Sequence, residues 1–159
     1  MKLSTLFRLE ENLNLDKKTL TILRWIAIIG QFFAINFVYF YLKLEFPIFI
    51  CTAIILVGFT TNIYLQFKIK GNQIKDFYAS LFLIYDLLQL SLLLYFTGGI
   101  SNPFSILLIV PAIVSSTFLS MGTTFILGAI SMSFLFLLTI FHYPLPGLHE
   151  YGITFPKFY

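Results

Sequence analysis

The residues best suited to bind a ligand form one short segment, Gly98 to Phe104, with the sequence Gly-Gly-Ile-Ser-Asn-Pro-Phe. Gly98 or Gly99 can adopt the left-handed conformation that ends a helix. Asn102 is a favoured N-cap, and Pro103 fits the first helical position, where its missing N–H costs nothing. The segment therefore predicts a helix end followed by a helix start, whose N–H groups and partial positive charge face the loop. A tight turn without a ligand would use the same residues.

A lipid-soluble ring with carbonyl oxygens, such as a quinone, would suit this segment. Backbone N–H groups near Gly99 and Ser101, the Ser101 hydroxyl and the Asn102 amide are donors, whereas a quinone carries two acceptors and no donors. Phe96 and Phe104 could pack against the ring. A quinol has O–H donors and would satisfy these groups less well, so the site would distinguish redox states. The candidate quinone-binding residues are Gly98, Gly99, Ser101, Asn102, Pro103, Phe104 and Phe96.

Asp86 is the one acidic residue inside an apolar run. An ionisable side chain at membrane depth suggests a functional role, and Gln89, three residues later, lies on the same helical face. Asp86 precedes Gly98 by about 18 Å of helix, which is too far to touch a ring held at the loop. Two interpretations stay open for Asp86 and Gln89: they fix helix packing, or they take part in proton or signal coupling.

The sequence indicates no other chemistry. It contains no Walker loop, no Ser-His-Asp set and no paired carboxylates, so we expect no catalytic residue in this chain. His142 and His149 are separated by two prolines and form no metal-ligand cluster, so we expect no metal site. Cys51 is the single cysteine and cannot form an internal disulfide.

The elements that must position these residues are membrane helices. Of the 159 residues, 58% are hydrophobic and 11% are charged, whereas about a quarter are charged in a soluble domain. The mean hydropathy is +0.91. These values exclude a disordered chain and an ordinary soluble domain, and a net charge of +3 is too small to favour a nucleic-acid partner. A polytopic protein of the lipid bilayer remains.

A bilayer core needs roughly 20 apolar residues in a helix. Five runs approach this length, so we expect an all-α bundle with transmembrane helices near 22–42, 47–67, 77–97, 104–120 and 122–141. Their short connections make consecutive helices antiparallel neighbours. Gly58, Gly122 and Gly128 predict close helix contacts, and Pro111 predicts a kink.

The basic residues predict the orientation. Five of the ten, including Arg24, lie in residues 1–24, and three lie in the loop 68–75. Five spans place both regions on one side, which the positive-inside rule assigns to the cytoplasm of a bacterial inner membrane. We therefore expect a cytoplasmic leader (1–21), a transmembrane bundle (22–141) and an outer loop (142–159). The odd number of spans suggests that this loop precedes a sixth helix absent from the sequence.

The heptad Gly98–Phe104 resembles the GGxxNPF element of the RegB/PrrB-type redox-sensing histidine kinases. Other segments resemble the first and third helices of that family or fit its pattern: 23–27, Gly30, Gln31, 86–90, 94–97 and Pro111. In helix count and loop order the resemblance covers the whole chain.

The resemblance implies a six-helix sensor in which this heptad contacts ubiquinone, and oxidised quinone restrains autophosphorylation of a cytoplasmic histidine kinase. The kinase region would bind ATP, work as a homodimer and phosphorylate a response regulator that controls redox-responsive genes. The sequence departs from the family by lacking the sixth helix, the phosphoacceptor histidine segment and the ATP-binding domain. Cys51 does not correspond to the family's redox cysteine. We therefore expect the membrane sensor region of a protein-histidine phosphotransferase.

Two other classes stay open. A transporter or channel often shows repeated halves and helices broken at the midplane, whereas this sequence has one break, at a surface loop. A small subunit that anchors a quinone-linked respiratory enzyme often carries haem-ligating histidines inside its helices. Both histidines here lie outside the expected spans.

Overall fold

The computed structural model describes residues 15–143, apart from 42, 44, 69, 70 and 72. Within these residues four helices are long and apolar enough to cross a membrane: α2 (Lys17–Phe40), α3 (Ile48–Lys68), α4 (Asp76–Phe96) and α6 (Met121–Ile140). A shorter apolar helix runs from Pro103 to Phe118. The described residues thus form an all-α bundle, as expected, in which four helices rather than the expected five have the length to cross a membrane.

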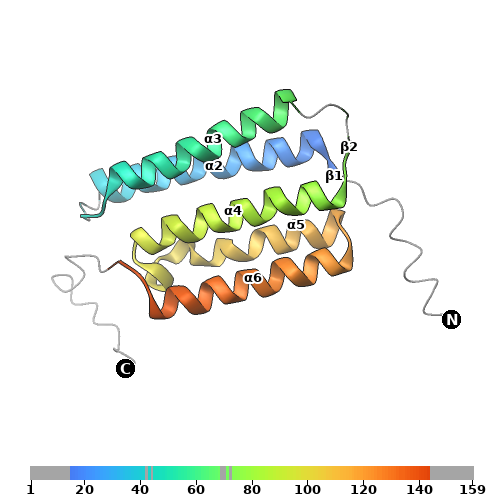
Figure 1. The fold of residues 1–159 in the computed structure, drawn as a ribbon. Helices are drawn as coiled ribbons and strands as arrows, with labels where there is room; N and C mark the ends of the chain where they lie inside the picture. Colours follow the sequence, from blue (N-terminus) through green and yellow to red (C-terminus); the bar gives the residue numbers. More distant parts are fainter. Residues whose placement is uncertain (1–14, 42, 44, 69–70, 72, 144–159) are drawn as a thin grey trace.

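The helices form two groups (Figure 1). Helices α2 and α3 lie side by side as a hairpin, whereas α4 packs with α5 (Val110–Phe118) and α6, and α3 contacts α4. The larger hydrophobic core lies mainly between α4, α5 and α6 around Leu87, Leu94 and Leu127. Large apolar side chains also cover the outside, where Phe49 is 88% exposed. Helices that are apolar on all faces are typical of a membrane bundle.

A two-residue strand pair closes one end of the bundle. Strand β1 (Leu15–Asp16) pairs antiparallel with β2 (Gln73–Ile74), and Leu15 lies opposite Ile74. Because β1 precedes α2 and β2 precedes α4, the first turns of both helices lie at the same end (Figure 1). Strand β1 before α2 and strand β2 in the basic loop after α3 therefore lie at one end of the bundle, as predicted.

The expected leader and outer loop fall mostly outside the described residues. Helix α2 begins at Lys17, so residues 17–21, expected in the leader, are helical. Residues 1–14 and 144–159, which include His149, lie outside the described residues.

Asp76 fastens the turn between α5 and α6 to the start of α4. Its carboxylate accepts hydrogen bonds from the Ser120 backbone N–H at 3.0 Å, the Ser120 hydroxyl at 3.1 Å and the Thr123 hydroxyl at 2.7 Å. Ser120 is also the N-cap of α6 and accepts a bond from the Thr123 N–H. A carboxylate beside two helix N-termini is stabilised by both dipoles.

The segment expected as one helix over 104–120 changes helix type partway. It begins as a seven-residue 3₁₀ helix, η3 (Pro103–Ile109), and continues as α5. Runs of 3₁₀ helix longer than three or four residues are uncommon. Pro111 has no N–H to donate to the Leu107 carbonyl, which instead accepts from Val110. The change of helix type thus falls beside the proline where a kink was predicted.

One of the three glycines predicted at close helix contacts lies at such a contact. A Cβ on Gly58 would overlap the side-chain amide of Gln89. A Cβ on Gly122 or Gly128 would meet nothing within 4 Å, so the prediction is wrong for these two residues.

Candidate functional site

The glycine pair ends α4 as predicted. Gly98 has a φ of 102° and Gly99 a φ of 60°, both left-handed. The chain then makes a single 3₁₀ turn, η2 (Gly99–Ser101). A Cβ on Gly99 would lie 2.5 Å from the Cβ of His142 and 2.8 Å from the Leu138 carbonyl oxygen. Gly99 is therefore required twice, by its backbone conformation and by the close approach of the end of α6.

Asn102 is the N-cap of η3, and Pro103 follows it at the first helical position, as predicted. The Asn102 Oδ1 atom accepts the Phe104 N–H at 2.9 Å. Its Nδ2 atom donates to the Thr97 carbonyl at 3.1 Å and to the Thr97 hydroxyl oxygen at 2.8 Å. Both amide hydrogens are thus used inside the loop, and a ligand carbonyl would have to replace one of these bonds.

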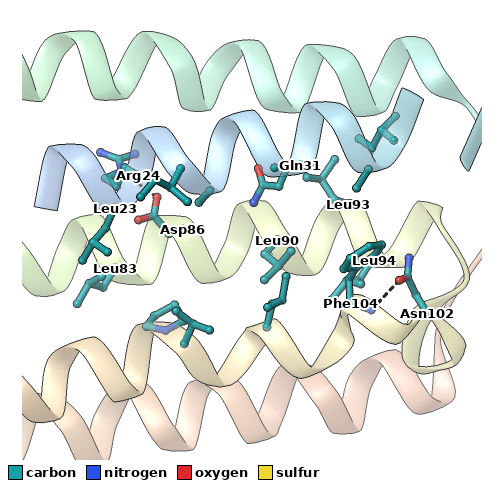
Figure 2. A pocket seen from close by; sticks show the side chains of 18 of the residues that line it. Leu23, Arg24, Gln31, Leu83, Asp86, Leu90, Leu93, Leu94, Asn102 and Phe104 are labelled. Carbon is teal, nitrogen blue, oxygen red and sulfur yellow. Dashed lines mark hydrogen bonds and ion pairs between the residues drawn. The ribbon is translucent and has the colours of Figure 1, made fainter. Parts of the chain in front are cut away.

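A groove of about 430 Å³ begins at this loop and runs along the bundle (Figure 2). It lies between α2, α4 and the η3–α5 segment. Asn102 and Phe104 line one end, Gln31 and Leu90 lie midway, and Arg24 and Asp86 line the other end. The walls between these polar residues are formed mainly by aliphatic side chains of the three segments. Asn102 and Phe104 of the loop and Asp86, which lie far apart along the sequence pattern, therefore line one groove.

The other predicted site residues have different positions. Gly98, Gly99, Ser101 and Pro103 build the loop without lining the groove. Phe96 packs against the second hydrophobic cluster, which joins α2, α3 and the end of α4. Gln89 does not line the groove, but its Nε2 atom donates to Oε1 of Gln31, which does, at 2.7 Å.

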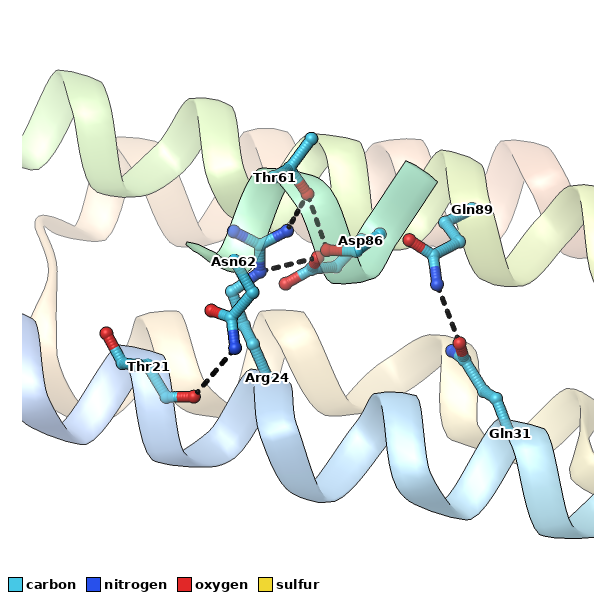
Figure 3. Close-up of polar contacts among 8 residues, drawn as sticks. Thr21, Arg24, Gln31, Thr61, Asn62, Asp86 and Gln89 are labelled. Carbon is cyan, nitrogen blue, oxygen red and sulfur yellow. Dashed lines mark hydrogen bonds and ion pairs between the residues drawn. The ribbon is translucent and has the colours of Figure 1, made fainter. Parts of the chain in front are cut away.

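Arg24 is buried in the bundle and forms an ion pair with Asp86 (Figure 3). Its Nε atom donates to Asp86 Oδ1 at 3.0 Å, and its Nη2 atom donates to the Thr61 hydroxyl on α3 at 2.9 Å. The guanidinium also lies 5.0 Å from the ring centre of Phe82 and 5.6 Å from that of Tyr85. The Arg24 side chain is 2% exposed and that of Asp86 is 25% exposed.

Arg24 is therefore not one of the flanking basic residues that set the orientation, as its position near the start of the first run predicts, but a buried partner of Asp86. Arg24 lies seven residues into α2 and joins three helices. The sequence did contain a signal for it, because a carboxylate at membrane depth needs a partner, and Arg24 is the one Lys or Arg inside the expected run 22–42.

Comparisons with known proteins bear on the family. No protein-family model matches the chain, and no solved structure matches it. The chain is 35% identical over 143 residues to the sensor histidine kinase RegB of Cereibacter sphaeroides. The match includes 89% of this chain and 31% of the relative, so the chain spans about a third of the relative's length. The chain is thus a membrane helical bundle related in sequence to the RegB-type sensor histidine kinases.

Proposed function

We propose that this chain is the membrane sensor region of a two-component histidine kinase and responds to the redox state of the membrane quinone pool. The observation that carries the proposal is the groove that connects the loop Gly98–Phe104 with Asp86 inside an apolar bundle. The relation to a sensor histidine kinase supports the kinase part of the proposal.

The dimensions and lining of the groove favour a quinone. Its volume of about 430 Å³ lies within the range of roughly 300–1,000 Å³ that small-molecule sites have. A mostly apolar lining with a few polar groups suits a neutral ring with a long hydrocarbon tail. The Phe104 side chain is 42% exposed and can pack against the ring.

The proposed topology has five spans with the N-terminus in the cytoplasm. Pro103–Phe118 would be the fourth of these spans in chain order. As an α-helix its residues would extend about 24 Å, but seven residues in 3₁₀ conformation lengthen it to roughly 27 Å. That length approaches the roughly 30 Å of a bilayer core. Even without Arg24, the basic residues before α2 and in the loop after α3 keep the charge bias toward that side.

The output would depend on a kinase region in a longer protein. There ATP would phosphorylate a histidine, a homodimer would form the active unit, and a response regulator would receive the phosphate. Helices α2 and α4 begin at the proposed cytoplasmic end, so a change in the groove would reach that side of the membrane along helices.

Quinone binding tests the proposal. The chain in lipid nanodiscs should retain a short-chain ubiquinone above the amount held by empty nanodiscs. Phe104→Ala should lower the affinity about tenfold, because the ring loses its aromatic contact. Phe125→Ala is the matched control, since Phe125 is 75% exposed on α6 away from the groove. Retention no greater than that of empty nanodiscs would contradict the proposal.

A further inference from the structure

A second pocket lies between α3 and α4, at the end of the bundle where α3 finishes and α4 begins (Figure 1). Its volume is about 530 Å³, which is within the range of small-molecule sites. None of the described residues that line it also lines the groove. Its lining is more polar than that of the groove and includes three tyrosines and a lysine: Tyr64, Tyr78, Tyr85 and Lys75.

The polar groups of the pocket that are nearest to its open end are available to a ligand. The Lys75 side chain and the hydroxyls of Tyr64 and Tyr78 make no hydrogen bond or ion pair to another described residue. All three side chains are exposed. An ammonium donates up to three hydrogen bonds, and a phenol both donates and accepts. The pocket therefore presents one positive charge and two hydroxyl groups.

The pocket becomes more apolar with depth along α4. Tyr78 and Phe82 lie on one face of this helix, about 3 Å and about 9 Å beyond its first residue. Leu81, beside Phe82, also lines the pocket and is 47% exposed. The lining thus changes from charged and polar to apolar within two helical turns. A phospholipid has the same order, from its headgroup to its acyl chains, and the headgroup layer is several ångströms thick.

The charges at this end of the bundle favour an anionic ligand. Among the described residues, four lysines and two aspartates lie there: Lys17, Lys18, Lys68, Lys75, Asp16 and Asp76. The Asp76 carboxylate accepts hydrogen bonds from Ser120 and Thr123 at the start of α6, on an element that does not line the pocket. A surplus of positive charge therefore remains near the pocket.

We propose that this pocket binds the headgroup of an anionic phospholipid. Basic pockets between transmembrane helices bind such headgroups, whereas interfacial tyrosines alone would be only an aromatic belt. Lys75 is the one cation among the described lining residues, so a lipid with a single phosphate, such as phosphatidylglycerol, matches its charge. Lys75 pairs with the phosphate, Tyr64 and Tyr78 bond to the phosphate or the glycerol hydroxyls, and the acyl chains lie along Leu81 and Phe82.

A lipid in this position would also strengthen the attachment of the α2–α3 hairpin to α4. It contacts α3 at Tyr64 and Thr61 and α4 at Tyr78. Thr61 already accepts a hydrogen bond from Arg24 on α2, so the lipid would lie one side chain away from the buried ion pair. Binding of this lipid does not depend on a quinone in the groove, and quinone retention tests the proposed function separately.

The test titrates phosphatidylglycerol or phosphatidylcholine with the same acyl chains into the chain in detergent, and native mass spectrometry counts the bound lipid. The wild-type chain should bind phosphatidylglycerol about tenfold more tightly, because its phosphate has no cationic group beside it. Lys75→Gln should remove this preference. Tyr78→Phe should weaken both lipids about threefold, since its hydroxyl bonds to the phosphate of either.

Lys18→Gln is the matched control, because Lys18 is an exposed lysine at the same end that does not line the pocket. It should change both affinities by less than about twofold. Inorganic phosphate and glycerol 3-phosphate at millimolar concentration should not displace the lipid, since neither has acyl chains to contact the apolar part of the pocket.

Four results would overturn the proposal. Equal affinity of the wild-type chain for the two lipids would mean that the pocket does not select an anion. Equal losses in Lys75→Gln and Lys18→Gln would indicate diffuse attraction to this end of the bundle. Displacement by inorganic phosphate would indicate a site for soluble phosphate. If Lys75→Gln does not fold, unchanged binding by Tyr78→Phe, which loses a single oxygen, is sufficient.

Discussion

The two ends of the groove are held together by different kinds of contact. At the loop end, Asn102 bonds to Thr97 and Phe104, which are five and two residues away in the sequence. At the other end, Arg24 bonds to Thr61 and Asp86, which are 37 and 62 residues away and lie on two other helices. The first end is a local capping structure, and the second is a tertiary contact on which the arrangement of three helices depends.

This difference indicates what each end can do. A local cap keeps its shape when neighbouring helices shift, because all its hydrogen-bond partners lie within five residues of Asn102. The Arg24 contacts change whenever α2, α3 or α4 moves relative to the others. A ligand that contacts Asp86 can therefore alter helix packing directly, whereas a ligand at the loop can do so only by displacing the cap.

The largest loss of stability is expected from breaking the ion pair between Arg24 and Asp86. Arg24→Leu leaves the Asp86 carboxylate without its cation, and removing one partner of a buried pair costs about 3–5 kcal/mol of unfolding free energy. Unfolding of the chain in mixed micelles by added SDS, followed by circular dichroism, measures the change. The double variant Arg24→Leu/Asp86→Leu should recover most of the loss.

Lys18→Leu is the control, since Lys18 is exposed in the first turn of α2. It should change the unfolding free energy by no more than about 0.5 kcal/mol. Equal stability of Arg24→Leu and Lys18→Leu would mean that the ion pair does not hold the three helices together.

An intermediate loss of stability is expected from substitution of Gly99 in the loop. Gly99→Ala places a methyl group in a left-handed residue and against the Leu138 carbonyl, which should cost roughly 2–4 kcal/mol in the same assay. Gly122→Ala is the matched control, because its Cβ meets nothing within 4 Å and alanine favours a helix. It should be neutral or stabilise by up to about 1 kcal/mol. The same loss at both positions would show that the contact with the end of α6 is unimportant.

The smallest loss of stability is expected from removal of the Asn102 N-cap of η3. Asn102→Ala removes the acceptor of the Phe104 N–H and should cost about 1 kcal/mol. Asn102→Asp keeps this acceptor and loses only the bonds to Thr97, so it should cost less. Hydrogen exchange of the Phe104 amide should be faster in the alanine variant and close to wild type in the aspartate variant. Slower or equal exchange in Asn102→Ala would contradict the assigned cap.

The sequence predicted the local features well, because their causes lie within a few residues. The helices expected at 77–97 and 122–141 are confirmed to within one residue as Asp76–Phe96 and Met121–Ile140. The left-handed glycines and the Asn102 cap are confirmed as well. A cap is determined by the side chain and the backbone turn that it closes, so sequence spacing is sufficient information.

Features that depend on helix packing could not be predicted in the same way. Hydropathy shows that Arg24 lies near an apolar run, but only the packing of α2 against α3 and α4 shows that it is buried. The empty space beside Gly122 and Gly128 depends on packing too. The 3₁₀ stretch of η3 has the same apolar composition as an α-helix. Its sequence pattern therefore does not show whether each N–H bonds to the carbonyl three or four residues earlier.

The strand pair at one end of the bundle has a mechanical consequence for the groove. The pairing of Leu15 with Ile74 fixes the separation of α2 and α4 at their first turns. Separation of α2 from α4, one of the ways in which the groove can widen, is therefore a splaying of the two helices about this end. The displacement grows with distance along the helices, so it is small beside Arg24 and largest at the loop Gly98–Phe104.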